Sequence, residues 1–327
     1  MSFRHAKTTL LGVLVLCALA SAATSHLNPY AYWLNVAYSI GINIILAVSL
    51  NLINGHTGQF SLGHAGFMAV GAYTAAIITN HVGTVSPLVA NLLFPGALLA
   101  GGLAAALAGL LVGLPTLRLR GDYLAIVTLG FGEIIRVVLQ NMDAVGGSRG
   151  YSVTHFWTNT FWAFGLAAVT IYVIGALVNS TYGRGFIAVH DDEIAAEAMG
   201  INTTKYKVTA FVVGAFFAGI AGGLFAHSTL YLTPTGFGFM QSIAFVVMVI
   251  LGGMGNTAGV VLAAILLTLL PEGLRFLAAV HIPGLAAERP LAWIADTRMI
   301  IYSLLLILLM LARPQGLFGA KGLRARK

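Results

Sequence analysis

Charged residues are scarce in this sequence. Of its 327 residues, 58% are hydrophobic and only 8% are charged, whereas a typical soluble domain carries about a quarter charged residues. No Lys, Arg, Asp or Glu occurs between Lys7 and Arg118, and none occurs between Lys207 and Glu272. Each stretch is several times longer than the roughly 20 apolar residues that one membrane-spanning helix requires. The composition therefore excludes an ordinary soluble fold.

The motifs of several chemistries are also missing. A single cysteine, Cys17, excludes an intrachain disulfide and a C-x-x-C site. The nine His form no H-E-x-x-H or similar liganding pattern, which leaves His56 and His64 as weak metal candidates. None of the five Lys completes a G-x-x-x-x-G-K-[ST] phosphate loop, so the chain cannot hydrolyse ATP by that route. We predict no cofactor and no metal on this chain.

Two further patterns point away from the functions that they first suggest. The sequence GMGNTA at 253–258 matches a dinucleotide-binding fingerprint, but no βαβ alternation surrounds it, so we interpret it as a tight turn. The net charge of +7 is dispersed among loops rather than gathered on one soluble face, which argues against nucleic acid as a partner.

The long apolar stretches are continuous rather than alternating. Lipid offers the backbone no hydrogen-bond partner, so spanning segments are helices or closed barrels, and barrel strands alternate. The sequence therefore predicts an all-α polytopic membrane protein with a single transmembrane domain over 1–327. Apolar runs predict ten spans, near 8–24, 34–53, 64–80, 93–115, 123–141, 161–179, 208–227, 239–253, 257–277 and 297–312.

Three of these spans, 64–80, 239–253 and 297–312, are short, and runs of that length also occur as re-entrant or buried core helices. The first span has a rival interpretation. Arg4 and Lys7 precede it and Ala20, Ser21 and Ala22 end it, as in a cleavable signal peptide; we favour an uncleaved anchor.

The basic residues set the orientation. If both termini are cytoplasmic, twelve of the seventeen Lys and Arg lie inside and four lie outside, which satisfies the positive-inside rule. The inside set is Arg4, Lys7, Arg118, Arg120, Arg184, Lys205, Lys207, Arg313, Lys321, Arg324, Arg326 and Lys327, and the outside set is Arg149, Arg275, Arg289 and Arg298. All four Trp, namely Trp33, Trp157, Trp162 and Trp293, are then expected at the outer interface.

The spans also suggest an internal repeat. Spans two to five and seven to ten enter the membrane from opposite sides, with the sixth as connector, as in an inverted-topology repeat. HTGQFSLGHAGF at 56–67 and PTGFGFMQSI at 234–243 place a Thr-Gly pair before Phe-rich sequence after the second and seventh spans. The alternative is that Thr, Gly and Phe are simply common in membrane turns.

One large hydrophilic segment, about 180–207, is expected in the cytoplasm. It contains a short helix that Asp191 or Asp192 caps and that Gly200 ends. Glu193 and Glu197 stand at i and i+4, so two like charges share a face, and a positively charged partner would remove the cost. The segment is either a docking element or a solvated loop helix.

Two sets of polar residues lie at predicted membrane depth. Glu133 and Arg136 are the only charges deep within a span, and their i, i+3 spacing allows a pair that serves either packing or transport. The segment 51–66, NLINGHTGQFSLGHAG, interrupts two apolar runs with four Gly. It is either an interfacial turn or a discontinuous helix that lines a pathway. Its candidate pathway residues are Gly58, Gln59, Ser61 and His64.

The cytoplasmic segment resembles the coupling loop of ABC importer permeases, on Glu193, Ala195, Ala196 and Gly200. The surrounding sequence is similar to the LivM-type permeases of branched-chain amino acid importers. Three blocks carry that similarity: GQFSLGHAGFMAVGAY at 58–73, RLRGDYLAIVTLGFGEIIR at 118–136 and LARPQGLFG at 311–319. The similarity covers most of the chain after the first span. His190 stands where an Arg is expected in this family, which puts one ATPase contact in doubt.

The resemblance implies a permease of the bacterial inner membrane that imports branched-chain or other hydrophobic amino acids. It implies a related permease subunit, two cytoplasmic ABC ATPases that bind ATP and Mg, and a periplasmic substrate-binding protein. ATPase closure would move the helix at 191–200, with Ala195, Ala196 and Met199 as its apolar contact surface. Urea-like amides and aromatic acids are alternative substrates in such permeases. The rival classes are a secondary transporter that uses Glu133 or His64, and an intramembrane enzyme, for which no catalytic constellation appears.

Overall fold

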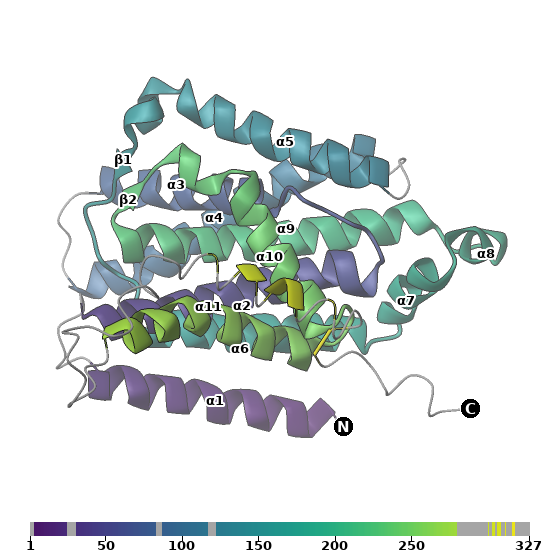
Figure 1. Cartoon of the computed structure of the whole chain (residues 1–327), viewed down its shortest axis with the longest axis horizontal. Coiled ribbons are helices and arrows are strands. Elements are labelled where there is room, and N and C mark those ends of the chain that lie inside the picture. Colours follow the sequence, from purple (N-terminus) through teal and green to yellow (C-terminus); the bar gives the residue numbers. More distant parts are fainter. Residues whose placement is uncertain are drawn as a thin grey trace, which may run out of the picture.

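The computed structural model describes residues 3–24, 31–82, 87–116 and 122–279, together with 300, 303–304, 306–308, 311 and 316–317. Within these residues the chain forms a bundle of helices (Figure 1). They are α1 (Phe3–Thr24), α2 (Tyr32–Asn51), α3 (His64–His81), α4 (Pro87–Thr116), α5 (Asp122–Gln140), α6 (Thr160–Val178), α7 (Gly183–Asp191), α8 (Glu193–Ala198), α9 (Thr203–Thr229), α10 (Phe239–Gly252) and α11 (Thr257–Ala279).

The apolar runs are confirmed as helices, with edges that move by a few residues. Seven helical stretches in the described residues are long and apolar enough to cross a membrane. The described apolar part of α1 is shorter, at Leu10–Thr24, and α3, among the spans predicted to be short, is buried along most of its length. The all-α polytopic fold is therefore confirmed. The tenth predicted span, 297–312, lies largely outside the described residues.

Small residues bring the central helices into backbone contact. A Cβ on Gly222 of α9 would lie 2.0 Å from the Met68 carbonyl oxygen of α3, and a Cβ on Gly71 would lie 2.2 Å from the Gly219 Cα. In lipid, where helices gain little from hydrophobicity, such close packing is what holds them together. The glycines of these helices therefore place α9 directly against α3.

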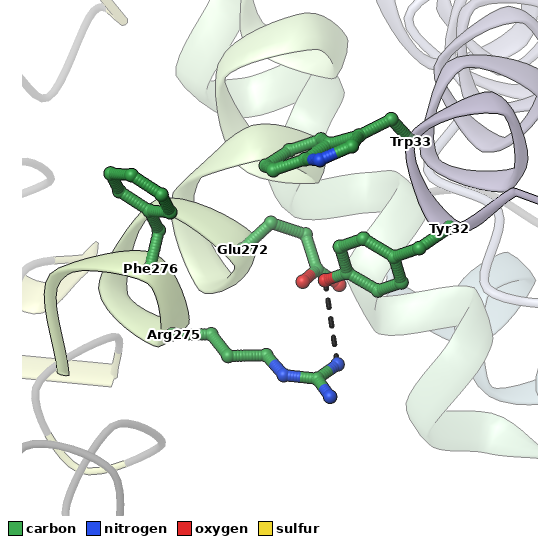
Figure 2. A pocket seen from close by; sticks show the side chains of 5 residues that line it. All are labelled: Tyr32, Trp33, Glu272, Arg275 and Phe276. Atoms are coloured by element: carbon green, nitrogen blue, oxygen red, sulfur yellow. Dashed lines mark hydrogen bonds between the residues drawn. The ribbon is translucent and has the colours of Figure 1, made fainter. Parts of the chain in front are cut away.

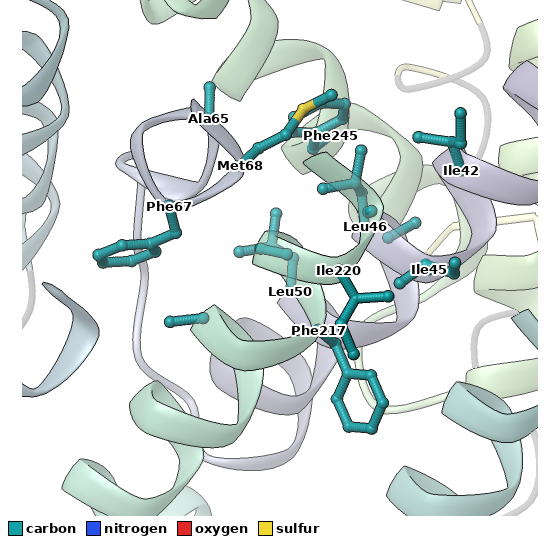
Figure 3. Close-up of a cluster of buried hydrophobic side chains, with 14 of the residues drawn as sticks. Ile42, Ile45, Leu46, Leu50, Ala65, Phe67, Met68, Phe217, Ile220 and Phe245 are labelled. Carbon is teal, nitrogen blue, oxygen red and sulfur yellow. The ribbon is translucent and has the colours of Figure 1, made fainter. Parts of the chain in front are cut away.

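Large apolar side chains fill the space around this contact. Ile45, Leu46 and Leu50 of α2 are fully buried, and Phe67 of α3 and Phe245 of α10 are buried with them (Figure 3). A helix that is apolar on all sides is stable only when other helices or lipid surround it. The parts of the uncharged stretches that form α2, α3 and α10 therefore lie at the centre of the bundle.

The bundle has two distinct ends. The hydrophilic segment 180–207 forms α7 and α8 at one end, and a short antiparallel pair, β1 (Tyr151–Ser152) and β2 (Tyr231–Leu232), lies at the other (Figure 1). Sequence patterns did not predict this pair, because about 80 residues separate two-residue strands that carry no alternation. Trp33 begins α2 and Trp157 follows β1, both at the β1–β2 end. Trp293 lies outside the described residues.

Peripheral helices leave apolar faces uncovered. The α1 helix packs on α6, where the hydroxyl oxygens of Thr24 and Thr160 are 3.2 Å apart. The α5 helix lies at the opposite edge of the bundle (Figure 1) and exposes Ile126, Ile134 and Val138. Apolar surface of this extent faces lipid or another subunit.

Candidate functional site

The helix predicted in the hydrophilic segment 180–207 is confirmed as α8, with both of its predicted ends. The Asp192 carboxylate accepts hydrogen bonds from the backbone N–H of Ile194 and Ala195, at 2.9 and 3.0 Å, which caps the N-terminus. Asp191 instead ends α7. At the other end Gly200 has φ +81, a left-handed conformation that Gly adopts without steric cost.

Both glutamates of α8 have partners within the chain. The Lys207 ammonium of α9 lies 2.7 Å from a Glu193 carboxylate oxygen, and the Lys207 side chain is only 5% exposed. The Thr203 hydroxyl donates to Glu197 at 2.8 Å. The positively charged partner that the i, i+4 pair requires is therefore a residue of α9. Both contacts hold α8 against the start of that helix.

The apolar surface of α8 differs from the predicted one. Ala196 is only 5% exposed, so its side chain adds little to an exposed contact surface, and its role in ATPase coupling stays a prediction. Ala195 is exposed, and the large exposed side chains are Ile194 at 67% and Met199 at 82%. Ile194 was missed because an isolated short helix does not reveal which face its neighbour covers.

The α7 helix connects this end to the interrupted segment 51–64. A Cβ on Gly58, which has φ +68, would lie 2.6 Å from the Nδ1 atom of His190. The last turn of α7 therefore lies directly against the backbone of the segment. The predicted pathway residue Gly58 is thus a contact point with α7, and His190 faces the transmembrane domain at this point.

The segment itself is a broken helix whose backbone is held by side chains. A π-helical turn, Leu52–His56, continues α2, and residues 57–63 are irregular. The Asn54 side chain accepts from the Ser61 N–H at 3.1 Å, and the Thr128 hydroxyl of α5 accepts from the Leu62 N–H at 3.1 Å. Irregular backbone inside a helical bundle requires such internal partners. The connection between α2 and α3 is therefore held in the protein interior, and its role as an interfacial turn or as part of a pathway stays a prediction.

Many polar side-chain atoms in this segment have no partner. Eight buried side-chain N or O atoms in the described residues lack a hydrogen-bond partner, and six of them lie between positions 51 and 64. They are Asn51 Nδ2, His56 Nε2, both amide atoms of Gln59, Ser61 Oγ and His64 Nδ1. Each such group costs about 1–3 kcal/mol unless water or a second conformation satisfies it. Segment 51–64 therefore holds most of the buried side-chain atoms without a hydrogen-bond partner in the described residues.

His64 is enclosed by neighbouring side chains. Its Nε2 atom lies 2.9 Å from the Ser49 hydroxyl oxygen, which is also 3.0 Å from the Leu46 carbonyl oxygen. Its Nδ1 atom has no hydrogen-bond partner in the described residues. Phe67 and Phe245 meet the imidazole edge to face. His64 is therefore a fully buried polar group among aromatic rings.

Glu133 and Arg136 form the predicted ion pair within a candidate span, but the pair is only partly buried in the described residues. The Arg136 Nε donates to Glu133 Oε2 at 2.6 Å, and the two side chains are 26% and 31% exposed, for Arg136 and Glu133 respectively. The second Glu133 oxygen accepts from the Phe239 N–H at 3.0 Å, at the start of α10. The pair therefore satisfies a helix N-terminus, whose dipole favours a carboxylate.

A cavity of about 520 Å³ lies beside this ion pair. Glu133 and Arg136 line one side, and Thr235, Gly238 and Gln241 line the other. The pair is half-exposed because this cavity is open, between α5 and the first turn of α10. The i, i+3 spacing predicted that Glu133 and Arg136 share one helix face. It gave no indication that the start of α10 donates a hydrogen bond to Glu133.

The other predicted features have plain structural outcomes. Gly253 and Gly255 have φ +93 and +80, as the interpretation of 253–258 as a tight turn requires. Asn256 begins α11 by accepting from the Gly259 N–H at 3.2 Å. Within the described residues no three His, Cys, Asp or Glu side chains lie close enough to hold a metal.

Comparisons with known proteins agree on one family. Residues 32–310 match the family described as branched-chain amino acid transport system / permease component. The high-affinity branched-chain amino acid transport system permease protein LivM of Salmonella typhimurium is 36% identical over 296 residues, and LivM of Escherichia coli gives the same values. The match covers 80% of this chain and 64% of each relative, slightly less than two thirds of their length.

A second type of permease is also similar. The permease protein LivH of Salmonella typhimurium is 28% identical over 182 residues, which cover 54% of this chain and 52% of that protein. The family model covers most of the chain and includes the broken helix, the Glu133–Arg136 pair and α8. The chain is a multi-pass protein of the inner membrane, and it belongs to the family of branched-chain amino acid transport system permease components.

Proposed function

We propose that this chain is the membrane-spanning permease subunit of an ATP-binding-cassette importer for branched-chain or other hydrophobic amino acids. The single observation that carries the proposal is the match of residues 32–310 to this permease family. The names of the LivM relatives state the same type of substrate for those proteins. The role is transport rather than catalysis, and ATP and Mg bind to separate ATPase subunits.

The proposed partners are a related permease subunit, two cytoplasmic ATPases and a periplasmic substrate-binding protein. The exposed apolar residues Ile126, Ile134 and Val138 of α5 support a permease–permease interface on this helix. The cavity beside Glu133 and Arg136 then lies at that interface. Its half-exposed ion pair would line the translocation pathway between the two permeases, which fits the usual place of ionisable groups at membrane depth.

The proposed topology has ten spans, two cytoplasmic termini and an inverted repeat. Two broken connections support the repeat. The Thr57–Gly58 connection lies at the α7 end of the bundle, against His190. The Thr235–Gly236 connection follows β2, at the opposite end. Corresponding breaks at opposite ends are what an inverted repeat requires.

Coupling is proposed to pass from α8 to the broken helix. Ile194 and Met199 offer an exposed apolar surface that suits a groove on an ATPase. A displacement of α8 would move α7, which lies against Gly58. The segment 51–64 is suited to respond, because its unpartnered polar groups oppose its present conformation. ATP-driven closure would thereby rock the bundle between outward and inward openings.

The docking step is tested with Ile194→Glu and Met199→Glu. Two carboxylates on the contact surface should abolish co-purification of the ATPase subunits, because a buried unpaired charge is strongly disfavoured at an interface. Met254→Glu is the matched control, since Met254 is also exposed, at 54%, in the turn between α10 and α11 near Gly55. Wild-type ATPase recovery in the double variant would refute docking through α8.

A further inference from the structure

The cavity beside Glu133 and Arg136 has the size and position of a small-molecule site. Its volume of about 520 Å³ falls within the range of about 300–1,000 Å³ that is usual for such sites. All of its lining residues lie within two candidate membrane spans, Tyr123–Gln140 and Pro234–Gly252. One of them, Thr235, follows β2 by three residues, so the cavity lies toward the β1–β2 end of the bundle (Figure 1). In the proposed topology this end faces the periplasm, from which a substrate arrives.

The two charges of the cavity are held differently. Both Glu133 oxygens have partners, because Oε1 accepts from the Phe239 N–H at 3.0 Å and Oε2 accepts from the Arg136 Nε at 2.6 Å. Arg136 makes no further hydrogen bond within the described residues, and its side chain is 26% exposed. The four N–H donors of its two terminal nitrogens therefore remain available. A carboxylate in the cavity could accept two parallel hydrogen bonds from them.

The pair has no net charge, and this property selects the kind of ligand. A free anion on Arg136 would also lie close to Glu133, and a free amine on Glu133 would lie close to Arg136, so each would meet a like charge. A zwitterion avoids both costs, because its carboxylate lies on the guanidinium while its ammonium lies beside the carboxylate. Each Glu133 oxygen has a second lone pair for that ammonium. An α-amino acid carries both groups on one carbon atom, which matches two side chains in direct contact.

The remaining walls suit an apolar side chain. Phe239 and Met240 line the cavity together with Gly236 and Gly238, and Met240 is 77% exposed. The two glycines leave space, and an unbranched Met side chain adapts to groups of different shape. Apolar walls distinguish ligands that differ by one methylene only weakly. Walls of this kind accept leucine, isoleucine and valine alike.

We propose that this cavity binds the substrate amino acid as a zwitterion, with its carboxylate on Arg136 and its ammonium on Glu133. The inference rests on the proposed function and deepens it, because it names the groups that recognise the substrate within the permease. An acid without the ammonium, or an amine without the carboxylate, leaves one charge of the pair opposed by a like charge. The cavity therefore binds neutral amino acids and disfavours their deaminated and decarboxylated analogues.

A second cavity provides a matched control. It lies where α2 begins and α11 ends, has a volume of about 190 Å³ and is lined by Tyr32, Trp33, Glu272, Arg275 and Phe276 (Figure 2). The exposed Arg275 is turned toward Tyr32: it donates to the hydroxyl at 3.4 Å, and its guanidinium carbon lies 5.0 Å from the ring centroid (Figure 2). Arg275→Lys therefore makes the same chemical change as Arg136→Lys, but outside the proposed site.

Binding is measured on the purified full chain by saturation-transfer NMR, with leucine, 4-methyl-2-oxopentanoate and 3-methylbutylamine as probes. The two analogues are leucine without its ammonium and leucine without its carboxylate. The wild-type chain should bind leucine at least about tenfold more tightly than either analogue, the effect of one charge-assisted contact. Arg136→Lys keeps the charge but removes the planar fork, so leucine should bind about tenfold more weakly. Arg275→Lys should bind leucine as the wild type does.

Glu133→Gln should invert the order of the probes. The amide oxygen can still accept from the Phe239 N–H, so the start of α10 keeps its partner. The cavity then carries a net positive charge, and 4-methyl-2-oxopentanoate should bind more tightly than leucine. A variant that only loosened the structure would weaken the binding of all three probes alike.

Three results would overturn the inference: equal binding of leucine and its two analogues by the wild-type chain, leucine binding that Arg136→Lys leaves unchanged, and competition by phosphoethanolamine as effective as that by leucine. The third would identify a lipid headgroup as the occupant. ATP-driven leucine uptake by the assembled importer separates this inference from the proposed function. If uptake occurs while the binding results fail, only the inference is refuted; if the wild-type chain supports no ATP-driven uptake, the proposed function is refuted.

Discussion

Glu193→Gln should release α8 from the transmembrane domain. The change leaves the Lys207 ammonium, 5% exposed, without the carboxylate that lies 2.7 Å away. Removal of one member of a buried pair costs about 3–5 kcal/mol, and the 24% exposure of Glu193 lowers the expected loss to about 2–3 kcal/mol. This energy corresponds to about a 30- to 150-fold increase in local opening.

The matching variant should be milder. Lys207→Met removes the buried charge itself and leaves Glu193 able to reach water, so we expect a loss of less than about 1 kcal/mol. Hydrogen exchange at the amides of 194–200, read by mass spectrometry, measures both openings. The double variant should exchange as slowly as Lys207→Met. Faster exchange in Lys207→Met than in Glu193→Gln would refute the assignment of the buried charge.

Three further outcomes follow from the site. Arg136→Ala should impair assembly more than Glu133→Gln combined with Arg136→Met, because it leaves a half-buried carboxylate unpaired at a cost of about 1–2 kcal/mol; recovery of assembled complex measures this. Gln59→Leu removes two buried polar atoms that lack a partner, so it should raise the free energy of unfolding by about 1–2 kcal/mol and lower transport. A stabilised variant with full transport would contradict a role of Gln59 in the transport cycle. A cysteine at position 195, with Cys17 replaced, should react with reagents only from the cytoplasm; periplasmic labelling would overturn the topology.

The sequence was sufficient for the helices and for the ends of α8. Continuous apolar runs predict spans because lipid leaves the backbone few alternatives. The short helix at 193–198 was predictable because its two signals, Asp192 as a cap and Gly200 as a stop, act within one or two turns. Local chemistry of this kind does not depend on the rest of the fold.

The contacts of these elements were not predictable, because they join residues that are distant in sequence. Lys207 as the partner of Glu193, and Phe239 as the donor to Glu133, depend on how α9 and α10 pack. For the same reason the burial of Ala196 and the exposure of Ile194 could not be separated from sequence. The unpartnered groups of 51–64 emerge only when every other hydrogen bond is known.

The most direct test of the proposed function is uptake into proteoliposomes. The chain is reconstituted with its partner permease and two ATPases, and uptake of labelled leucine is measured with the binding protein outside. The account predicts uptake that requires ATP inside the vesicles and that stops when the ATPases are omitted. Uptake that persists without the ATPases, and that collapses when a proton or sodium gradient is dissipated, would contradict it and identify a secondary transporter.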